Sequence, residues 1–502
     1  MAEGEQGIVA AGHPLTAQVG AQVLREGGNA VDATVAAMLT SFAAEPLLTG
    51  LGAGGYMLVA GPGQEPALLD FFVQAPSDPR ADAVAPGAVA ELQPVDVSFG
   101  DAAQVFHIGP ASCGAYGAPA GVCEAAARWG TMPLAELAAP AAALAREGVA
   151  LNHGQAYVAE ILAGLLVSTP ECAALWAPDG HILREGEVLR NPDLGEALER
   201  LATDGAEPFY RGDIAAAVCE WLGERGGWLS ASDLAGYAAI EREPLRMPYR
   251  DREVLTNPPP NAGGTLLAYA LALLDRGPTP PTLRGVVESM RSAQEERTPD
   301  FLDGLSEDGF LDRFLARRLG STTHISVIDA DGRACSATST NGEGSGVVVP
   351  GTGMHLNNVM GEEDLNPFGF HLHPAGRRMP SMMAPTIVMR GGEVELVLGS
   401  AGSNRIRSAI LQTIVGSVDH DLDARAAVEA PRVHFEAGVV YAEPGIELAA
   451  LARQDAPGGE RLELVEFSEL NLFFGGVQAV RRRDGVLTGA GDPRRGGVAV
   501  SA

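Results

Sequence analysis

Lysine is absent from the sequence: all 35 basic residues of the 502-residue chain are arginine. A protein without lysine forms no lysine Schiff base, anchors no pyridoxal phosphate, and has neither a Walker A lysine nor a Ser-Lys dyad. Positive charge is scarce as well, because 35 basic residues stand against 64 acidic ones, which gives a net charge of −29. Nucleic acid is a polyanion and would be repelled, so we expect no nucleic-acid partner.

Cysteine is also sparse, and its positions exclude further kinds of site. The five cysteines form no CxxC pair, so we predict no disulfide framework and no zinc site, and we expect no metal or other cofactor. The sequence has no run of about 18 apolar residues, and residues 1–7 lack the basic and apolar parts of a secretory leader. We therefore expect a cytoplasmic protein without a membrane partner.

The residues that are present indicate a folded protein with mixed secondary structure. Hydrophobic residues make up 46% of the chain and charged residues 20%, which is typical of a globular protein. Apolar spacing predicts a pair of helices over residues 15–44, a buried strand at 56–60 and a helix at 265–274. Residues 322–340 and 386–398 are predicted as β-hairpins. The expected fold class is α/β (α+β), with helix layers packed on sheets.

Three weaker motifs are better explained as ordinary structure. Residues 50–55 satisfy GxGxxG, but they precede a strand, whereas a dinucleotide site follows one. Residues 419–423 resemble the start of a calcium loop, yet Ala424 stands where the loop needs glycine. His371 and His373 have the spacing of a metal pair but no third ligand, so we favour a polar loop.

The hairpin 322–340 carries the residues that point to catalysis. Pairing about its turn at 329–332 places Thr322 opposite Thr340. A threonine hydroxyl is a poor nucleophile without a base beside it, and a free α-amine on the same residue is one known base. That amine exists only after the chain is cut before Thr322, and the polar, acidic segment 293–320, which we predict to be mobile, precedes this point.

A second feature would complete a hydrolase site. Residues 399–405 are rich in glycine and serine and join a predicted strand to a predicted helix at 406–418. Backbone N–H groups at the start of a helix lack intrahelical partners and carry the positive end of the dipole, so they can stabilise an oxyanion. From pattern alone, an ordinary polar hairpin and turn remains the alternative.

These residues belong to a longer set of motifs that resembles the γ-glutamyltransferase (γ-glutamyltranspeptidase) family of the N-terminal nucleophile (Ntn) hydrolase superfamily. The resemblance runs over nearly the whole chain, in the family's order. The motifs that resemble its small subunit are Thr322-Thr323-His324-x-Ser326-Val327-x-Asp329, Thr340, Leu356-Asn357-Asn358, Pro385-Thr386 and Gly399-Ser400-x-Gly402. Those that resemble its large subunit are residues 26–33, 130–134, 209–212 and 258–264, and residues 492–494 match a further family motif.

The resemblance implies an αββα four-layer Ntn-hydrolase sandwich made as one precursor. The precursor would cut itself between Ser321 and Thr322, and residues 1–321 and 322–502 would stay together as a heterodimer of a large and a small chain.

The resemblance also assigns catalytic roles. Thr322 would be the nucleophile with its own α-amine as general base. Thr340 would hold Thr322 in place, and the backbone N–H groups of Gly402 and Ser403 would form the oxyanion hole.

At several positions that form the family's substrate pocket, this sequence has residues that differ from those of the family. The positions implied to bind substrate are Phe72, Asn341, Glu362, Ser381 and Met382. Where this chain has Phe72, the family has an arginine that binds the glutamate α-carboxylate. Where this chain has Val359 and Met382, the family has polar residues. A buried carboxylate without a cation is unfavourable.

We therefore expect a self-processing amidohydrolase or acyltransferase whose small-molecule amide substrate carries an acyl group less charged than γ-glutamate. Two alternatives remain open. One is a true γ-glutamyltransferase or glutathione hydrolase that uses another cation, such as Arg80 or Arg378. The other is a non-catalytic family member that acts as a binding protein.

Overall fold

The structure is a computed structural model that describes residues 6–77, 91–98, 103–295, 322–363, 365–366, 369–452 and 462–502. Ser321, Arg80 and all but the first three residues of the segment 293–320 lie outside the described residues. The predictions made for these positions therefore stay predictions.

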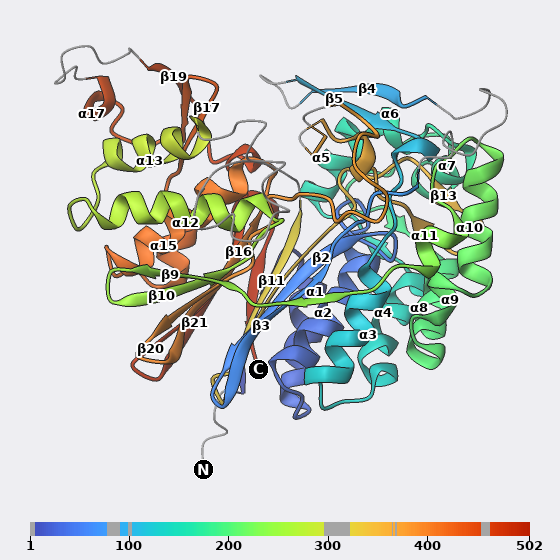
Figure 1. Ribbon diagram of the computed structural model, residues 1–502, viewed down its shortest axis with the longest axis horizontal. Coiled ribbons are helices and arrows are strands. Elements are labelled where there is room, and N and C mark those ends of the chain that lie inside the picture. The colour runs from blue at the N-terminus through green and yellow to red at the C-terminus, as the bar shows by residue number, and fades with distance from the viewer. Residues whose placement is uncertain are drawn as a thin grey trace.

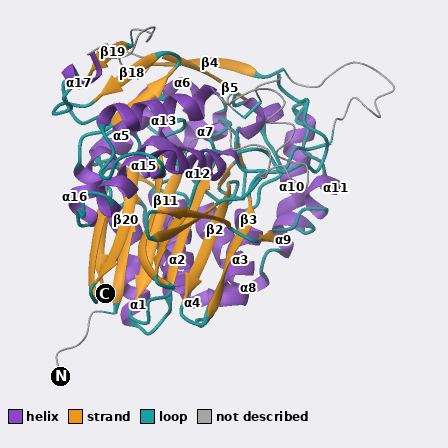
Figure 2. Ribbon diagram, turned by 60° about the vertical axis from the view of Figure 1, so that its left-hand side comes forward, coloured by secondary structure: helices purple, strands orange, loops and turns teal. Residues whose placement is uncertain are grey.

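Two large antiparallel sheets form the centre of the molecule (Figure 1). The seven-stranded sheet has the order β22 (Val498–Ser501), β1 (Gly7–Ala11), β11 (Thr323–Asp329), β12 (Ala334–Thr340), β2 (Gly54–Gly61), β3 (Gln64–Phe71), β8 (Ile240–Arg242). The six-stranded sheet has the order β21 (Val486–Gly491), β20 (Gly476–Arg483), β16 (Glu393–Ala401), β15 (Thr386–Arg390), β10 (Arg252–Thr256), β9 (Leu245–Tyr249). Figure 2 shows most strands of the two sheets, in orange, aligned along roughly one axis.

The inner faces of the two sheets pack against each other. Ser326 Oγ, on β11, donates to the carbonyl of Gln478, on β20, at 3.0 Å. Ser336 Oγ, on β12, donates to the carbonyl of Leu398, on β16, at 3.1 Å. Around these bonds lies a shared apolar cluster that includes Ile8, Leu58, Leu68, Ile328, Leu255, Ile387, Val397 and Val480. Because side chains alternate along a strand, each sheet has a second face to cover.

Helices cover both outer faces. Helices α1 (Pro14–Arg25) and α2 (Ala30–Ala44) pack on the seven-stranded sheet, in a core shared with Ile325 and Val327 of β11. Helices α12 (Ala262–Asp275) and α15 (Arg405–Val418) cover the six-stranded sheet (Figure 1). The predicted mixed fold is confirmed, as are the helices over 15–44 and 265–274 and both hairpins. No helix in the described ranges is long and apolar enough to span a bilayer.

The remaining elements flank this core. The other helices are α3 (Ala118–Trp129), α4 (Leu134–Glu147), α5 (His153–Ile161), α6 (Ala163–Leu166), α7 (Pro170–Trp176), α8 (Pro192–Asp204), α9 (Glu207–Tyr210), α10 (Asp213–Glu224), α11 (Ala231–Ala235), α13 (Leu283–Glu295), α16 (Ala424–Glu429) and α17 (Ala449–Ala452). Short strands are β4 (Gln93–Ser98), β5 (Ala103–Ile108), β6 (Val149–Ala150), β7 (Val188–Leu189), β13 (Val348–Val349), β14 (Met354–His355), β17 (Val433–Glu436), β18 (Val439–Ala442) and β19 (Glu463–Glu466). The 3-10 turns η4 (Leu472–Phe474) and η5 (Pro493–Arg495) border the candidate site.

Candidate active site

The predicted pairing of Thr322 with Thr340 agrees with the observed register. Thr323 pairs with Ser339 and His324 with Thr338, so Thr322 lies opposite Thr340 one residue further along. Alternation along the strand puts both threonines on the inner face with Ser326, between the two sheets. Thr322 is 2% exposed, and its Oγ1 forms no hydrogen bond with any described residue. Other buried hydroxyls share this state, among them Thr40 Oγ1 and Ser417 Oγ, so the place of Thr322 in the hairpin, opposite Thr340, is what marks it as the candidate nucleophile.

Thr340 is held by the turn that follows it. Its Oγ1 accepts a hydrogen bond of 2.8 Å from the backbone N–H of Gly342. Gly342 has a φ of 65°, and a Cβ there would lie 2.2 Å from both Asn358 Oδ1 and Glu362 Oε1. The turn therefore requires glycine, and it places Gly342, two residues after Thr340, beside the carboxylate of Glu362.

Asn341, between Thr340 and Gly342 in the sequence, is fully buried. Its backbone N–H donates to the carbonyl of Leu48 at 3.0 Å, and its own carbonyl accepts from Asn358. Its side-chain amide makes no hydrogen bond with the described residues. The amide of Asn341 is thus a polar group that a substrate could satisfy.

The predicted oxyanion turn connects β16 to α15. Gly402 and Ser403 have φ values of 120° and 56°, so the chain bends sharply just before the helix begins at Arg405. A Cβ at Gly399 would lie 2.3 Å from the ring of His324. This close packing holds the C-terminal end of β16 beside the N-terminal end of β11. The turn therefore lies near Thr322, as the oxyanion assignment requires.

His324, the third residue of the Thr-Thr-His motif, is held in place by neighbouring side chains. Its Nδ1 lies 2.8 Å from Thr338 Oγ1 and its Nε2 lies 2.9 Å from Ser326 Oγ. Burial lowers the pKa of His324 to about 3, so the ring is neutral at ordinary pH. The ring packs against Gly399 of the other sheet and carries no charge at the site.

The substrate positions implied by the family are closely packed. Phe72 is fully buried, stacks on Tyr56 with ring centroids 5.6 Å apart, and shares an apolar cluster with Val359. Ser381 Oγ accepts from the N–H of Met383 at 3.0 Å. Met382 belongs to a different apolar cluster, the one beneath α12. The structure therefore brings Phe72 and Val359 together but places Met382 apart from them.

Arg378, one of the two alternative cations, is already engaged. It is 5% exposed, pairs with Asp70 at 3.3 Å and donates to the carbonyl of Phe72 at 2.8 Å. Its guanidinium also lies over the ring of Tyr237, 4.6 Å from the centroid. This environment argues against Arg378 as the replacement for the missing arginine.

Glu45 is a residue of the site that the sequence analysis missed. Its Oε1 accepts from Thr16 Oγ1 at 2.8 Å and its Oε2 accepts from Thr323 Oγ1 at 2.9 Å. Burial raises the pKa of Glu45 to about 7, and the two hydrogen bonds oppose that rise. One signal was available, because Glu45 is a single carboxylate at the end of the long apolar helix 30–44.

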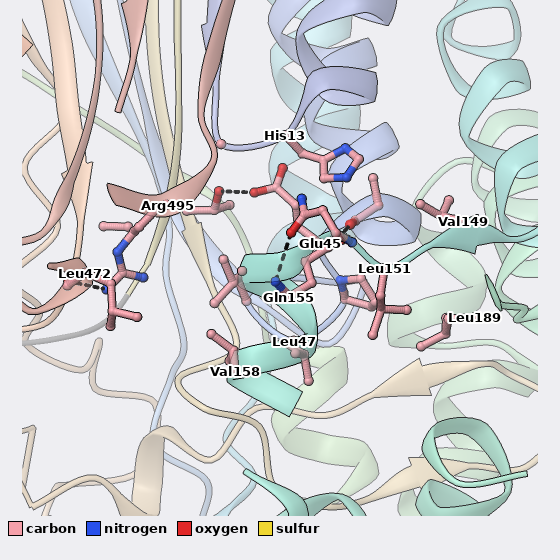
Figure 3. Close-up of a pocket in the computed structure, with 18 of the residues that line it drawn as sticks. His13, Glu45, Leu47, Val149, Leu151, Gln155, Val158, Leu189, Leu472 and Arg495 are labelled. Atoms are coloured by element: carbon pink, nitrogen blue, oxygen red, sulfur yellow. Dashed lines mark hydrogen bonds between the residues drawn. The ribbon is translucent and has the colours of Figure 1, made fainter. Parts of the chain in front are cut away.

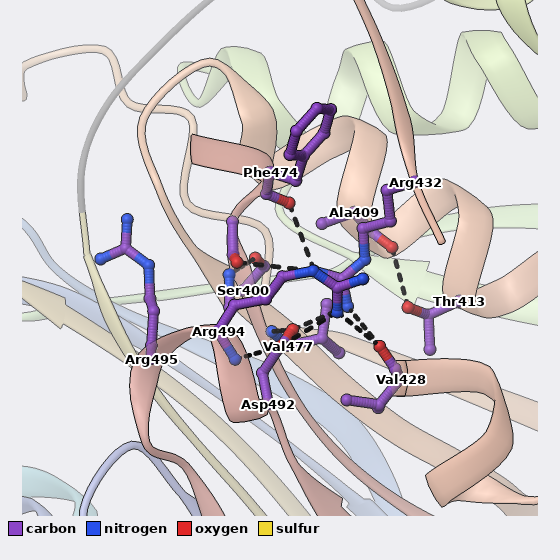
Figure 4. A network of polar contacts seen from close by, with 12 residues as sticks. Ser400, Ala409, Thr413, Val428, Arg432, Phe474, Val477, Asp492, Arg494 and Arg495 are labelled. Carbon is purple, nitrogen blue, oxygen red and sulfur yellow. Dashed lines mark hydrogen bonds and ion pairs between the residues drawn. The ribbon is translucent and has the colours of Figure 1, made fainter. Parts of the chain in front are cut away.

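A buried ion-pair network lies near Ser400, at the C-terminal end of β16 (Figure 4). Arg494 pairs with Glu443 at 2.5 Å, and Arg432 pairs with Asp492 at 2.7 Å. Asp492 also accepts from the N–H of Val477 at 2.8 Å, which joins the network to β20. The network fixes the short turn η5.

Arg495, the next residue, points away from this network (Figure 4). A Cβ at Gly402 would lie 3.3 Å from its Nη2, so the guanidinium lies beside the oxyanion turn. Burial and the neighbouring Arg405 lower the pKa of Arg495 to about 10, which leaves it charged at neutral pH.

A cavity opens at this end of β11 (Figure 3). Thr323, Ala401, Gln478 and Arg495 line one part of it, and Glu45 lies in its wall. Figure 3 shows Arg495 and Leu472 on one side of Glu45, and Val149, Leu151 and Leu189 on the other. The cavity thus runs from Thr323, the residue after the candidate nucleophile, into an apolar region.

The described residues contain no group of three histidine, cysteine or acidic side chains that could hold a metal ion. His371 lies 2.8 Å from the carbonyl of Ala111, and His373 lies 3.2 Å from that of Leu365. The two rings thus contact carbonyls of two separate segments of the chain. All five cysteines are free thiols.

Comparisons with known proteins agree with this geometry. The acylase ACY 1 proenzyme of Pseudomonas sp. (strain SE83) is 31% identical, over 100% of this chain and 94% of that protein. The glutathione hydrolase proenzyme of Escherichia coli (strain K12) is 30% identical, over 98% of this chain and 90% of that protein. The crystal structure of cephalosporin acylase from Bacillus halodurans superimposes with a TM-score of 0.83 at 26% identity, covering 99% of this chain and 96% of that one.

The model of the family described as Gamma-glutamyltranspeptidase matches residues 16–315 and 312–502, nearly the whole chain. With relatives at this level of identity over their full length, the chain belongs to the gamma-glutamyltranspeptidase family.

Proposed function

We propose that the protein is a self-processing amidohydrolase or acyltransferase with an N-terminal threonine nucleophile, built as the four-layer αββα sandwich of Ntn hydrolases. The observation that carries the proposal is the buried, unpaired Oγ1 of Thr322 on the inner face of β11, opposite Thr340 and near the turn at Gly402. The printed names of the acylase and glutathione hydrolase relatives, both proenzymes, support processing before activity.

The proposed reaction begins when the chain is cut between Ser321 and Thr322, which frees the α-amine of Thr322. The Thr322 hydroxyl attacks the amide carbonyl while this amine takes its proton. The N–H groups of Gly402 and Ser403 donate to the oxyanion of the tetrahedral intermediate. Collapse of the intermediate returns the proton to the leaving amine and leaves an ester on Thr322. Water, or an acceptor amine, then attacks the ester and releases the acyl group.

We propose an acyl group other than γ-glutamate. Phe72 stands where the family has its carboxylate-binding arginine, and Phe72 and Val359 fill that region with apolar side chains. Arg378 already forms an ion pair with Asp70. A substrate with a free carboxylate would therefore be buried there without a cation, which is unfavourable.

The second candidate is a γ-glutamyltransferase or glutathione hydrolase. Two observations favour it: the side-chain amide of Asn341 makes no hydrogen bond with the described residues, and the carboxylate of Glu362 lies beside Gly342. Both groups would suit the polar head group of a glutamyl substrate.

Two measurements test the proposal. Intact mass and a denaturing gel of the purified protein should show chains corresponding to residues 1–321 and 322–502, whereas Thr322→Ala should remain a single chain. A panel of p-nitroanilides with neutral acyl groups, compared with γ-glutamyl-p-nitroanilide, then identifies the acyl class. A wild-type protein that stays uncut and hydrolyses no amide would favour the third reading, a binding protein.

A further inference from the structure

We propose that the cavity beside Thr322 binds an uncharged hydrocarbon group of the substrate, attached to the amide that Thr322 attacks. This inference rests on the proposed function and gives it a substrate class. The group could stand on the acyl side or on the amine side of the scissile bond, and its chemistry is the same in both cases.

The walls of the cavity are apolar. They come from four separate elements, β6, β7, α5 and α7, and from the loop after α2. The residues that supply them are Leu47, Val149, Leu151, Val158, Trp176 and Leu189. Leu47, Leu151, Trp176 and Leu189 are 1–5% exposed and belong to one hydrophobic cluster. A hydrocarbon group gains free energy by leaving water for such a lining, whereas a charged group loses its hydration there.

The polar end of the cavity lies where the reaction would take place. Thr323 directly follows the candidate nucleophile, and Ala401 directly precedes the oxyanion turn. A substrate amide at Thr322 would therefore have one of its substituents directed toward the apolar walls.

Most charged or titratable groups around the cavity have close partners in the protein. Both carboxylate oxygens of Glu45 accept hydrogen bonds from threonine hydroxyls, and Arg494 pairs with Glu443. His13 accepts from the N–H of Leu15, and burial lowers its pKa to about 4, so it is neutral at pH 7. Arg495 is less well satisfied: it donates to the carbonyl of Leu472 at 3.4 Å, and its Nε makes no hydrogen bond with the described residues. Away from Arg495, these contacts favour an uncharged occupant over an ionic one.

The region that holds the glutamyl group in the family does not offer the same space. Phe72 and Val359 are fully buried within the apolar cluster between the sheets. Two other cavities in the described part of the chain are lined by the β9–β10 region and by α12 and α13, and neither includes a residue of β11. Among these cavities, the one beside Thr322 is lined by residues of β11, namely Thr323 and His324.

The test uses two series of amides on the wild-type protein. The acyl series contains acetyl-, butyryl-, hexanoyl- and octanoyl-p-nitroanilide, and the amine series contains N-acetyl amides of methyl-, butyl- and octylamine. We expect kcat/KM to rise along one series, by roughly fourfold for each buried methylene, and to stay flat along the other. The series that rises identifies the half of the substrate in the cavity. Flat profiles in both series, or a preference for glutaryl- over pentanoyl-p-nitroanilide, would overturn the inference.

Variants that narrow the cavity test whether the dependence of kcat/KM on chain length arises there. Val158→Trp and Leu189→Phe should lower kcat/KM for the longest substrate at least tenfold and leave the acetyl substrate within twofold. Val167→Trp is the matched control, because Val167 is 48% exposed and does not line the cavity. An equal loss for short and long substrates in the cavity variants would contradict the assignment.

A binding measurement tests this inference independently of the proposed function. Calorimetry with octanamide and acetamide on the Thr322→Ala protein requires no turnover, and octanamide should bind at least tenfold more tightly. If the wild-type chain is never cut but octanamide binds and Val158→Trp abolishes that binding, the reaction is wrong and the cavity assignment holds. If cleavage and amide hydrolysis occur but octanamide binds no better than acetamide, the cavity assignment is wrong.

Discussion

Thr323 Oγ1 donates a hydrogen bond of 2.9 Å to Glu45 Oε2, across 278 positions of sequence. The bond joins the residue after the candidate nucleophile to a buried carboxyl group at the end of α2. Thr16, on α1, holds the other oxygen of the same carboxyl at 2.8 Å. The start of β11 is thus fixed to the helix layer outside its sheet.

Replacing Glu45 should change how stability depends on pH. Burial raises the pKa of Glu45 from 4.5 to about 7, so the folded chain holds a proton that the unfolded chain releases between these values. Wild-type stability should therefore fall as the pH rises from 4.5 to 7, by on the order of 3 kcal/mol for a shift of this size. Glu45→Gln is neutral at every pH, so its Tm relative to wild type should rise across this window and level off above it.

The buried histidines His13 and His324 have lowered pKa values, so they contribute an opposite trend that both proteins share. The Tm difference between variant and wild type isolates Glu45. A difference that does not change between pH 4.5 and 7 would show that the carboxyl titrates normally.

Thr322→Ala should abolish both cleavage and turnover, because the same hydroxyl is the proposed nucleophile in each. Thr323→Ala is the neighbouring control: it loses the hydrogen bond to Glu45 but should still be cut. A denaturing gel and intact mass follow cleavage, and p-nitroaniline release follows turnover. If Thr323→Ala were inactive and Thr322→Ala were processed, the assigned nucleophile would be wrong by one residue.

Thr340→Ala should slow both steps without stopping them. The substitution removes the acceptor of the Gly342 N–H and a hydroxyl opposite Thr322, and a single hydrogen bond of about 1 kcal/mol corresponds to a rate loss of roughly fivefold. Thr203→Ala, on the exposed surface of α8, serves as the control and should keep wild-type rates. An unchanged rate in Thr340→Ala would remove Thr340 from the site.

Phe72→Arg should shift specificity toward glutamyl substrates. We expect the wild type to hydrolyse neutral acyl anilides better than γ-glutamyl-p-nitroanilide, and the variant to narrow that ratio of kcat/KM. The shift should be partial and accompanied by a lower Tm, because Phe72 is fully buried and a charge there needs a partner. Phe72→Leu keeps the position apolar and should leave the ratio unchanged. A wild-type preference for the glutamyl substrate would restore the γ-glutamyltransferase assignment.

Breaking the ion-pair network should destabilise the fold. Glu443 and Arg494 are fully buried along their side chains, so Glu443→Ala leaves a buried guanidinium without its main partner, at a cost of about 3–5 kcal/mol. Glu429→Ala removes an exposed pair with Arg425 and should cost less than about 1 kcal/mol. Urea unfolding of the two variants measures the difference. Equal losses would contradict the structural role of the network.

The sequence by itself determined the local features of this protein. The paired helices of 15–44 and the hairpin that sets Thr322 against Thr340 follow from apolar spacing and turn residues, which act over a few positions. The turn at Gly402 was also predictable, since glycine adopts positive φ without strain. The family motifs followed from the order of residues along the chain.

Only the tertiary structure decided which distant groups meet at the site. The contact of Thr323 with Glu45, the ion pair of Arg378 with Asp70 and the cavity formed by four separate elements all join segments far apart in the sequence. Their formation depends on how helices and sheets pack, because the free energy of a buried side chain comes from all of its neighbours at once. Local spacing carries no record of those neighbours, which is why the folded structure was needed to show that Glu45 contacts Thr323.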